Sequence, residues 1–349
     1  MRSLTNILIT GGAGFIGSNF IRFILEECAD FKGRVINFDA LTYAGRTENL
    51  DDIKQRFGGS RYFFEHSDIR SEAAVESVIS AYNIDTIVHF AAESHVDRSI
   101  SGPRDFIETN VLGTWTLLDA ARRAWADADG KMREDTLFHH ISTDEVYGSL
   151  GSDGFFTETT PYSPRSPYSA SKAASDHLVM AYHHTYGLPV TLSNCSNNFG
   201  PFQFPEKLIP VIILNILAGK ALPVYGDGKN IRDWIYVDNH NSALWRILRA
   251  GKTGEKYNIG GETELDNLSL VNSLISVVTQ KAKMDAEAAR KTISFVRDRP
   301  GHDRRYAIDC SKIKRELGWK PHISFEEGLE KTVEWYISRA RCGVKPVSA

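Results

Sequence analysis

The opening of the chain most constrains what it can fold into. An apolar run, "NILIT", leads into the glycine-rich stretch "GGAGFIG", and apolar residues then recur at helical spacing. This order predicts a strand, a tight turn and a helix. Gly11 would permit the turn, Gly14 would let the backbone approach a pyrophosphate, and Gly17 would let helix and strand pack closely. Because the first N–H groups of such a helix attract an anion, the stretch is typical of a dinucleotide-binding unit, although the glycines alone would also fit a plain turn.

Further strand-like runs alternate with helix-like segments through residue 200. "RVINFDA" carries Asp39 near its end, "EHSDIR" places Asp68 and Ile69 where another strand ends, and "IDTIVHFAAESH" passes through the small residues Ala91 and Ala92. This alternation predicts an α/β fold with a doubly wound parallel sheet of Rossmann type. Ligands of such sheets lie beyond the carboxyl ends of the strands.

Asp39 indicates which dinucleotide binds. It follows Gly17 by 22 residues, at a position where an acid accepts hydrogen bonds from the ribose hydroxyls and repels a 2′-phosphate. We therefore expect NAD rather than NADP. Arg46 is the counter-argument, because an arginine close by could accommodate that phosphate.

Tyr168 and Lys172 lie four residues apart in "PYSASKAASDHL", which places them on one face of a predicted helix. Tyrosine has a reference pKa of about 10. A neighbouring ammonium and a positive nicotinamide would favour its phenolate form, so we expect Tyr168 to accept a proton from a sugar or alcohol hydroxyl. For an isolated pair, a surface Tyr and Lys would be the better interpretation.

Thr143, Asp144 and Glu145 follow directly after a strand-like run in "HHISTDEVYG". Oxidation of an alcohol needs a base and a hydroxyl donor such as Thr143, but no adjacent acids. Asp144 and Glu145 therefore predict a further proton transfer, most simply an elimination next to a new carbonyl, in which one acid group is the base and the other protonates the departing hydroxyl. The alternative is that either acid merely caps a turn.

The length of 349 residues predicts two domains, or one α/β unit with a substrate-binding lobe. We expect residues 1–200 to form a NAD-binding domain, with sheet elements contributed again near 230–260. Residues 201–349 would mainly form a smaller substrate-binding lobe, because prolines and glycines cluster there. The stretch "KALPVYGDGKNIRDWIYVDNH" predicts mixed short elements.

Composition argues against several partners. The net charge of -3 gives no field that would attract nucleic acid. The longest apolar run, "LIPVIILNIL", is too short to span a membrane, and no cleavable apolar segment precedes the first strand, so we expect a cytoplasmic protein. Cys28, Cys195, Cys310 and Cys342 lie far apart, which favours reduced, structural cysteines.

No metal site is expected from the histidine pairs. His139 and His140 are adjacent in a strand and would point to opposite faces. His183 and His184 would lie on or near the helix of Tyr168, as surface residues.

Six motifs along the chain carry a resemblance to a known family. They are "GGAGFIG", "AAESHVDRSI", "STDEVYG", "YSASK", "SNNFGPFQFPEKLIP" and "RPGHDRRYAID". Through them the chain closely resembles, nearly end to end, the dTDP-glucose 4,6-dehydratases, a family of extended short-chain dehydrogenases/reductases. The glycine and Tyr/Lys motifs are shared across that superfamily. The Thr-Asp-Glu triplet is much narrower, and the C-terminal motif is narrower still.

The resemblance implies an NAD-dependent hydro-lyase of deoxysugar biosynthesis, such as that of dTDP-rhamnose. Tyr168 would deprotonate the C4 hydroxyl of dTDP-glucose while hydride passes to NAD. Glu145 would then remove the C5 proton, and Asp144 would protonate the C6 hydroxyl as water leaves. Return of the hydride to C6, with reprotonation of C5, would give dTDP-4-keto-6-deoxyglucose. Because the same cofactor must return its hydride, tight retention of NAD is expected.

The expected site residues fall into three sets, and no metal ligand is among them. The catalytic set is Thr143, Asp144, Glu145, Tyr168 and Lys172. The cofactor-binding set is Gly11, Gly14, Phe15, Ile16, Gly17, Asp39, Leu41, Thr42, Asp68, Ile69, Ala91, Ala92, Tyr168 and Lys172. The substrate-binding set is Ser94, His95, Thr143, Asn197, Lys207, Leu208, Pro223, Tyr225, Arg232, Asn267, Arg299 and His302.

Three of these assignments have alternatives or a chemical argument of their own. Arg232 suits a diphosphate, because a guanidinium binds phosphate oxygens in a forked geometry. Asn267 precedes a helix-like run and could be its cap, with or without a role in the site. Arg299 and His302 would complete an anion pocket, or belong to a solvated charged face.

The resemblance also implies a homodimer built from two helices of each subunit. These would be the segments "NVLGTWTLLDAARRA" and "YSASKAASDHLVMAYHH". Their apolar residues fit either an interface or the core, and the candidates are Leu112, Trp115, Leu118, Ala121 and Leu178.

Competing functions remain open at this point. A nucleotide-sugar 4-epimerase or decarboxylase would share the fold, but an epimerase needs no pair of acids. A dehydratase of CDP- or GDP-sugars would keep the pair and change the base pocket. A nonenzymatic NAD-sensing or scaffold protein would have little reason to keep Tyr168, Lys172 and both acids.

Overall fold

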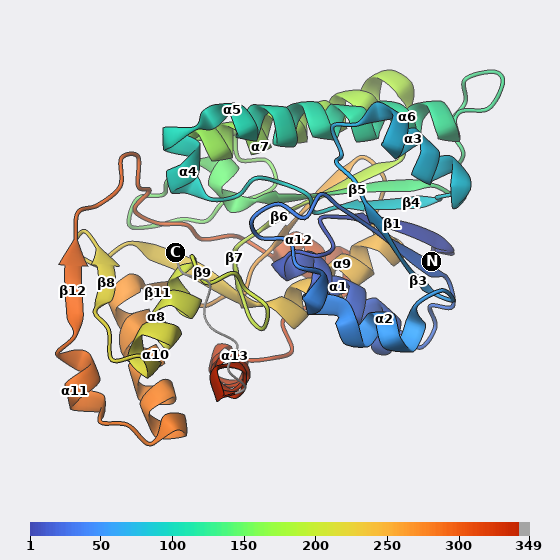
Figure 1. The fold of residues 1–349 in the computed structure, drawn as a ribbon. Helices are drawn as coiled ribbons and strands as arrows, with labels where there is room; N and C mark the ends of the chain where they lie inside the picture. Colours follow the sequence, from blue (N-terminus) through green and yellow to red (C-terminus); the bar gives the residue numbers. More distant parts are fainter. Residues whose placement is uncertain (342–349) are drawn as a thin grey trace.

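The computed structural model describes residues 1–341 (Figure 1). Its centre is a seven-stranded parallel sheet with the order β10-β6-β5-β4-β1-β2-β3. The strands are β1 (Asn6–Thr10), β2 (Arg34–Asp39), β3 (Tyr62–His66), β4 (Thr86–His89), β5 (Leu137–Thr143), β6 (Val190–Cys195) and β10 (Glu255–Ile259). The predicted doubly wound parallel sheet is confirmed.

Helices cover both faces of this sheet, which explains why strands β1, β4 and β6 are buried along their whole length. One face carries α1 (Phe15–Glu26), α2 (Asp51–Phe57), α9 (Val237–Ala250) and α12 (Ser311–Leu317). The other carries α3 (Glu72–Ala81), α4 (Val96–Ser101), α5 (Pro103–Phe106), the π-helical η2 (Ile107–Gly113), α6 (Thr114–Trp125) and α7 (Pro167–Tyr186). Two short 3-10 helices, η1 (Thr47–Leu50) and η3 (Asp144–Tyr147), follow strand ends.

Each layer has its own apolar core. Phe20 and Ile24 of α1 pack with Leu244 and Ile247 of α9 on the first face. On the second face, α6 packs between α3 and α7. Leu118 and Ala121 are completely buried there, and Leu178 is half buried against the same core. These three candidates for a dimer interface therefore belong at least partly to the core of the subunit.

A smaller lobe lies beside the carboxyl ends of the sheet strands (Figure 1). Its helices are α8 (Leu208–Leu217), α10 (Asn267–Ala282), α11 (Ala286–Arg290) and α13 (Phe325–Arg341). Its strands form two small sheets, one of β11 (Glu264–Asp266), β9 (Ile231–Tyr236) and β7 (Asn197–Phe199), the other of β12 (Ile293–Val296) and β8 (Leu222–Tyr225). The chain leaves the lobe after β9 to add α9 and β10 to the main body, and then returns.

Among residues 1–341, no helix combines the length and the apolar character that crossing a bilayer requires. In the same residues, no group of three or more His, Cys, Asp or Glu side chains lies close enough together to hold a metal ion. Cys28, Cys195 and Cys310 are buried free thiols. Cys342 and the end of the expected segment 201–349 lie outside the described residues.

Candidate active site

A cavity of about 1250 Å³ opens at the carboxyl ends of the central strands. β1 pairs with β2 on one side and with β4 on the other, so the connections leave in opposite directions at this point. Such a switch point is where parallel sheets bind ligands. Every residue of the three expected site sets lines the cavity, with the single exception of Leu41.

The glycine loop forms the floor of one end. Gly11 has φ +70, and a Cβ atom there would lie 2.6 Å from the backbone nitrogen of Ala91. A Cβ atom on Gly17 would lie 2.4 Å from the carbonyl oxygen of Gly11. α1 begins after Gly14, which provides no side-chain cap, so the first N–H groups of the helix are free for an anion. These residues fit the pyrophosphate of a dinucleotide.

Asp39 closes the loop through its carboxylate. It accepts hydrogen bonds from the backbone N–H of Ala13 at 2.9 Å and of Leu41 at 2.8 Å. Burial raises the pKa of Asp39, and these two hydrogen bonds oppose the rise. Leu41 therefore acts through its backbone. Arg46 lies outside the cavity lining, with its guanidinium 5.5 Å from the ring centroid of Phe204.

The middle of the cavity holds the predicted catalytic groups. β5 ends at Thr143 and η3 begins at Asp144. The Thr143 hydroxyl accepts a hydrogen bond from the backbone N–H of Glu145 and donates to Asp144 Oδ1, each at 3.3 Å. Thr143 is thus the cap of this turn, and the alternative that Asp144 or Glu145 caps it is wrong.

The two acids differ in their surroundings. Asp144 is 2% exposed, and its Oδ2 atom has no hydrogen-bond partner. Burial raises the pKa of Asp144 well above its usual value, the charges of Glu145 and Asp233 raise it further, and Arg232 and a hydrogen bond with Thr143 oppose the rise. Burial also raises the pKa of Glu145, but the cationic side chains of Arg299, Arg232 and Lys207 oppose that rise. Asp144 is therefore the better proton donor and Glu145 the better base.

Tyr168 and Lys172 both lie on α7, as their spacing predicts. The helix begins with a capping box between Ser166 and Ser169 and with Pro167 in its first turn, which fixes where it starts. Burial and the charge of Glu145 raise the pKa of Tyr168 well above 10, while a hydrogen bond with Thr143 acts the other way. The protein alone therefore favours the protonated phenol, and the phenolate expected beside both Lys172 and a positive nicotinamide stays a prediction.

Cationic side chains line the end of the cavity next to the lobe. Lys207 Nζ donates a hydrogen bond to the carbonyl oxygen of Ser94 at 3.1 Å. Arg232 is 5% exposed and donates to the carbonyl oxygen of Asp303 at 3.0 Å. Arg299 lies 3.9 Å from Asp97, and its Nε atom is buried without a partner. These cations suit a substrate that carries phosphates.

The outer rim of this end is aromatic and polar. The Tyr225 hydroxyl donates to Asp97 Oδ2 at 3.3 Å, and the ring meets His302 edge to face, with centroids 6.3 Å apart. Asn267 is the first residue of α10, whose cap is Asp266, so the cap interpretation of Asn267 is wrong. The remaining expected residues also line the cavity. They are Leu208 at the start of α8, Asn197 at the start of β7, Pro223 in β8 and His95 at the end of the loop before α4.

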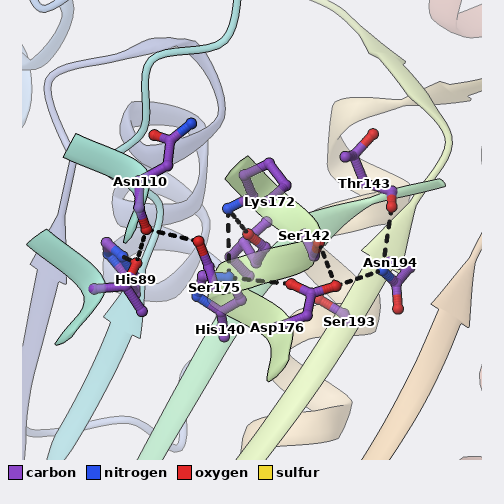
Figure 2. A network of polar contacts seen from close by, with 12 residues as sticks. His89, Asn110, His140, Ser142, Thr143, Lys172, Ser175, Asp176, Ser193 and Asn194 are labelled. Carbon is purple, nitrogen blue, oxygen red and sulfur yellow. Dashed lines mark hydrogen bonds and ion pairs between the residues drawn. The ribbon is translucent and has the colours of Figure 1, made fainter. Parts of the chain in front are cut away.

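Sequence reasoning missed the polar groups behind Lys172. Figure 2 shows His140 of β5 beside its ammonium group and Asp176 of α7 next to His140. Ser142 of β5 and Asn194 of β6 donate hydrogen bonds to Asp176. The spacing of Lys172 and Asp176 by four residues was a signal that the sequence contained. The contribution of β5 and β6 follows from strand register and was not visible in any single stretch.

The chain matches known proteins over almost its whole length. The family model described as GDP-mannose 4,6 dehydratase matches residues 8–332. A dTDP-glucose 4,6-dehydratase of Neisseria gonorrhoeae is 54% identical over 336 residues, with 95% of each chain covered. The dTDP-glucose 4,6-dehydratase 1 of Escherichia coli K12 is 52% identical over 344 residues, covering 96% of this chain and 93% of the relative.

A solved structure has the same fold. It is that of DesIV, a dTDP-glucose 4,6-dehydratase of Streptomyces venezuelae, determined with NAD bound. It matches with a TM-score of 0.87 and 44% identity, covering 97% of this chain and 98% of the other. The chain belongs to the dTDP-glucose 4,6-dehydratase family of extended short-chain dehydrogenases/reductases.

Proposed function

We propose that this chain is an NAD-dependent dTDP-glucose 4,6-dehydratase, a hydro-lyase that converts dTDP-glucose to dTDP-4-keto-6-deoxyglucose and water. The observation that carries the proposal is the meeting of Asp144 and Glu145 with Tyr168 and Lys172 in one cavity. An alcohol dehydrogenase or epimerase of this fold needs the second pair but has no use for the first. The relatives that match over most of their length bear the same activity in their names.

The glycine loop, the free N-terminus of α1 and Asp39 would hold the dinucleotide, and its nicotinamide supplies the hydride acceptor for C4 and the hydride donor for C6. The protein supplies the proton transfers. Tyr168, polarised by Thr143, accepts the proton of the C4 hydroxyl. Its raised pKa in the protein alone keeps it protonated until a positive charge is bound beside it, which ties oxidation to a loaded cofactor site.

The acids divide the elimination between them. Glu145 faces Arg299, Arg232 and Lys207, whose charges favour its carboxylate, so it removes the C5 proton once the C4 ketone acidifies it. Asp144 is buried and keeps its proton, which it gives to the C6 hydroxyl as the C–O bond breaks. C6 of the C5–C6 double bond would then receive the hydride, and Glu145 returns to C5 the proton that it removed. No net oxidation results, because the electron pair that leaves C4 with the hydride returns at C6.

The nucleotide would lie toward the lobe. Arg232 and Arg299 are placed for the diphosphate, while Pro223, Tyr225, Asn267 and His302 form the rim where the base would sit. The proposal includes that residues 1–200, with strands contributed again near 230–260, bind the cofactor and that the lobe binds the substrate. Its support is that the expected cofactor residues come from the main sheet and that several expected substrate residues come from the lobe.

A homodimer is a further part of the proposal. Leu112 is 52% exposed and Trp115 is 39% exposed on the α6 side of the molecule, and Ile107 nearby is 47% exposed. Large exposed apolar side chains close together in the chain, in η2 and at the start of α6, favour an interface between copies. We also propose a cytoplasmic location, supported by the buried free thiols of Cys28, Cys195 and Cys310, which a reducing compartment preserves.

An isotope experiment tests the proposed reaction. The purified protein, without added cofactor, is incubated with dTDP-glucose carrying deuterium at C4, and the product is analysed by mass spectrometry and NMR. We expect loss of one water and recovery of the label at C6. Label released to solvent, or a substrate of unchanged mass, would contradict the proposal. Removal of the bound dinucleotide should abolish turnover, and added NAD should restore it.

A further inference from the structure

A carboxylate behind the proposed site has no part in the proton transfers described above. Asp176 lies on α7 one turn beyond Lys172 and is 1% exposed. Its Oδ2 atom accepts hydrogen bonds from Ser142 Oγ at 2.9 Å, Tyr162 OH at 2.8 Å and Asn194 Nδ2 at 3.3 Å. Burial raises the pKa of Asp176, but Lys172 and these donors oppose the rise. Three donors directed at one oxygen favour the ionised carboxylate.

His140 lies between this carboxylate and the catalytic lysine (Figure 2). Its Nε2 atom lies 3.3 Å from Asp176 Oδ1 and 3.4 Å from Lys172 Nζ. The ammonium also donates a hydrogen bond to the carbonyl oxygen of Ile141 at 2.8 Å. All of these groups are buried, so the field of the carboxylate is weakly screened. A charged lysine without a negative partner would be costly at such a place.

The other titratable groups around Lys172 supply no charge. They come from three strands and from α7 itself, and are His89 of β4, His140 of β5, Cys195 of β6 and Tyr168. Burial lowers the pKa of His89 and His140 well below 6.5, so both rings are neutral. Burial raises the pKa of Cys195 to about 12 and that of Tyr168 well above 10. Among these groups Asp176 is the one that balances the ammonium.

We propose that Asp176 is a positioning residue, whose buried carboxylate acts through space, past the neutral ring of His140, to keep the ammonium of Lys172 charged and fixed against Ile141. The inference rests on the proposed function, because it is in the oxidation at C4 that Tyr168 needs a cation beside it. It adds a group that touches neither substrate nor cofactor. The polar face of α7 then has a functional order, with Tyr168, Lys172 and Asp176 on successive turns.

The titration of Lys172 tests this proposal without any substrate. The protein with its bound cofactor is labelled with 13C at lysine Cε, and the Lys172 signal is identified by its loss in Lys172→Arg. Burial lowers the pKa of Lys172 to about 8, and the charge of Asp176 opposes that fall. Asp176→Asn keeps the shape and removes the charge, so we expect the midpoint to fall by about one pH unit, the scale of shifts caused by a nearby charge.

The direction of the effect on turnover follows from the sign of this shift. The charged lysine is present below its pKa and is lost as pH rises through it. In Asp176→Asn the loss of kcat at high pH should therefore begin about one unit lower, with a roughly tenfold lower rate above both midpoints and an unchanged KM for dTDP-glucose. Tyr162→Phe is the matched control, because it removes one hydrogen bond to Asp176 and leaves the charge.

Two results would overturn the proposal. One is a Lys172 midpoint that does not move in Asp176→Asn. The other is a rate that falls by the same factor at every pH, which a merely structural role would give. If Asp176→Asn does not fold, 13C NMR of the aspartate carboxyls in the unaltered protein decides: an ionised Asp176 at pH 7 supports the proposal and a protonated one refutes it. Failure of the deuterium experiment would refute the dehydratase function and leave these titrations standing.

Discussion

Asp144 and Glu145 are neighbours in the chain, yet they meet different environments. Asp144 is buried beside Thr143, and the charge of one cation opposes the rise of its pKa, whereas the charges of three cations oppose that of Glu145. Two carboxyls with proton affinities pushed apart in this way suit one acid and one base. The assignment of the two roles at the scale of single residues therefore depends on neighbours that lie far away in the sequence.

Glu145→Gln tests the base. The amide has nearly the same size but cannot accept the C5 proton, so the C4 oxidation should proceed while water loss falls by at least about 10²-fold. Mixing the variant with dTDP-glucose should give a lasting absorbance of reduced nicotinamide. Glu48→Gln, the same change at an exposed residue of η1, is the control and should turn over normally. Normal dehydration by Glu145→Gln would remove Glu145 from the mechanism.

Arg299→Met tests the electrostatic support of that base. After burial, which raises the pKa of Glu145, the charge of Arg299 is the first of the influences that lower it. Without this charge the pKa of Glu145 should rise by roughly one unit. Glu145 works as a carboxylate, so activity exists above its pKa and is lost as pH falls through it. The acidic limb of kcat at saturating substrate should therefore move to higher pH.

Arg299→Lys separates charge from geometry in that experiment. It retains a cation, although not the forked donor geometry of a guanidinium, so its acidic limb should stay near that of the unaltered protein even if KM increases. An acidic limb that moves equally in both variants would show that the charge of Arg299 does not set the pKa of Glu145.

At the scale of elements, the unit of β1, the glycine loop and α1 combines a close approach with an open helix end. Gly11 and Gly17 leave no room for a side chain, and α1 has no side-chain cap and no acidic residue in its first turn. A helix that must receive an anion gains from both features, because a capping side chain would compete with the ligand for the same N–H groups.

Gly17→Ala should weaken this unit. The new Cβ atom would lie 2.4 Å from the carbonyl oxygen of Gly11, so backbone must move, at a cost of about 1–3 kcal/mol. We expect a lower Tm and loss of most of the bound dinucleotide, measured as the ratio of nicotinamide to protein after gel filtration. Gly151→Ala, where a Cβ atom meets nothing within 4 Å, should leave both quantities unchanged. Full retention of cofactor by Gly17→Ala would contradict this account.

At the scale of the whole molecule, two parts of the chain build one cavity between them. The main sheet provides the glycine loop and the catalytic groups, while the lobe contributes Leu208, Pro223, Tyr225, Arg232 and Asn267. A reaction that forms a reactive ketone benefits from such enclosure, because the intermediate is kept from water. The layer of η2 and α6 bears exposed apolar side chains, which fits a surface used for assembly.

Leu112→Glu should prevent the assembly. A buried, unpaired carboxylate at the proposed interface would cost more than a few kcal/mol. Light scattering during gel filtration should change from about twice the 39.0 kDa subunit mass to the mass of one subunit. Met284→Glu, at a residue of comparable exposure beyond the end of α10, should not change the mass. A monomeric unaltered protein would refute the proposed homodimer.

Several features of this protein follow from local sequence alone. The strand, turn and helix around "GGAGFIG" could be predicted because glycine positions and apolar periodicity are local properties. The placement of Tyr168 and Lys172 on one helix follows from a spacing of four residues. The position of Thr143, Asp144 and Glu145 at a strand end follows from the apolar run before them. The alternation of strand-like and helix-like segments is also visible in the local sequence, and it predicted the order of elements and the parallel sheet.

Tertiary structure decided the chemistry of these residues. The sequence argument for Tyr168 counted the ammonium four residues away and a bound nicotinamide, but it had no access to burial and to Glu145, which raise the pKa of Tyr168 in the fold. Asp176 and His140 meet at Lys172 because α7 packs across β5 and β6. Burial and charge act through space and fall off with distance rather than with separation along the chain, so only the folded molecule determines which acid keeps its proton and which lysine keeps its charge.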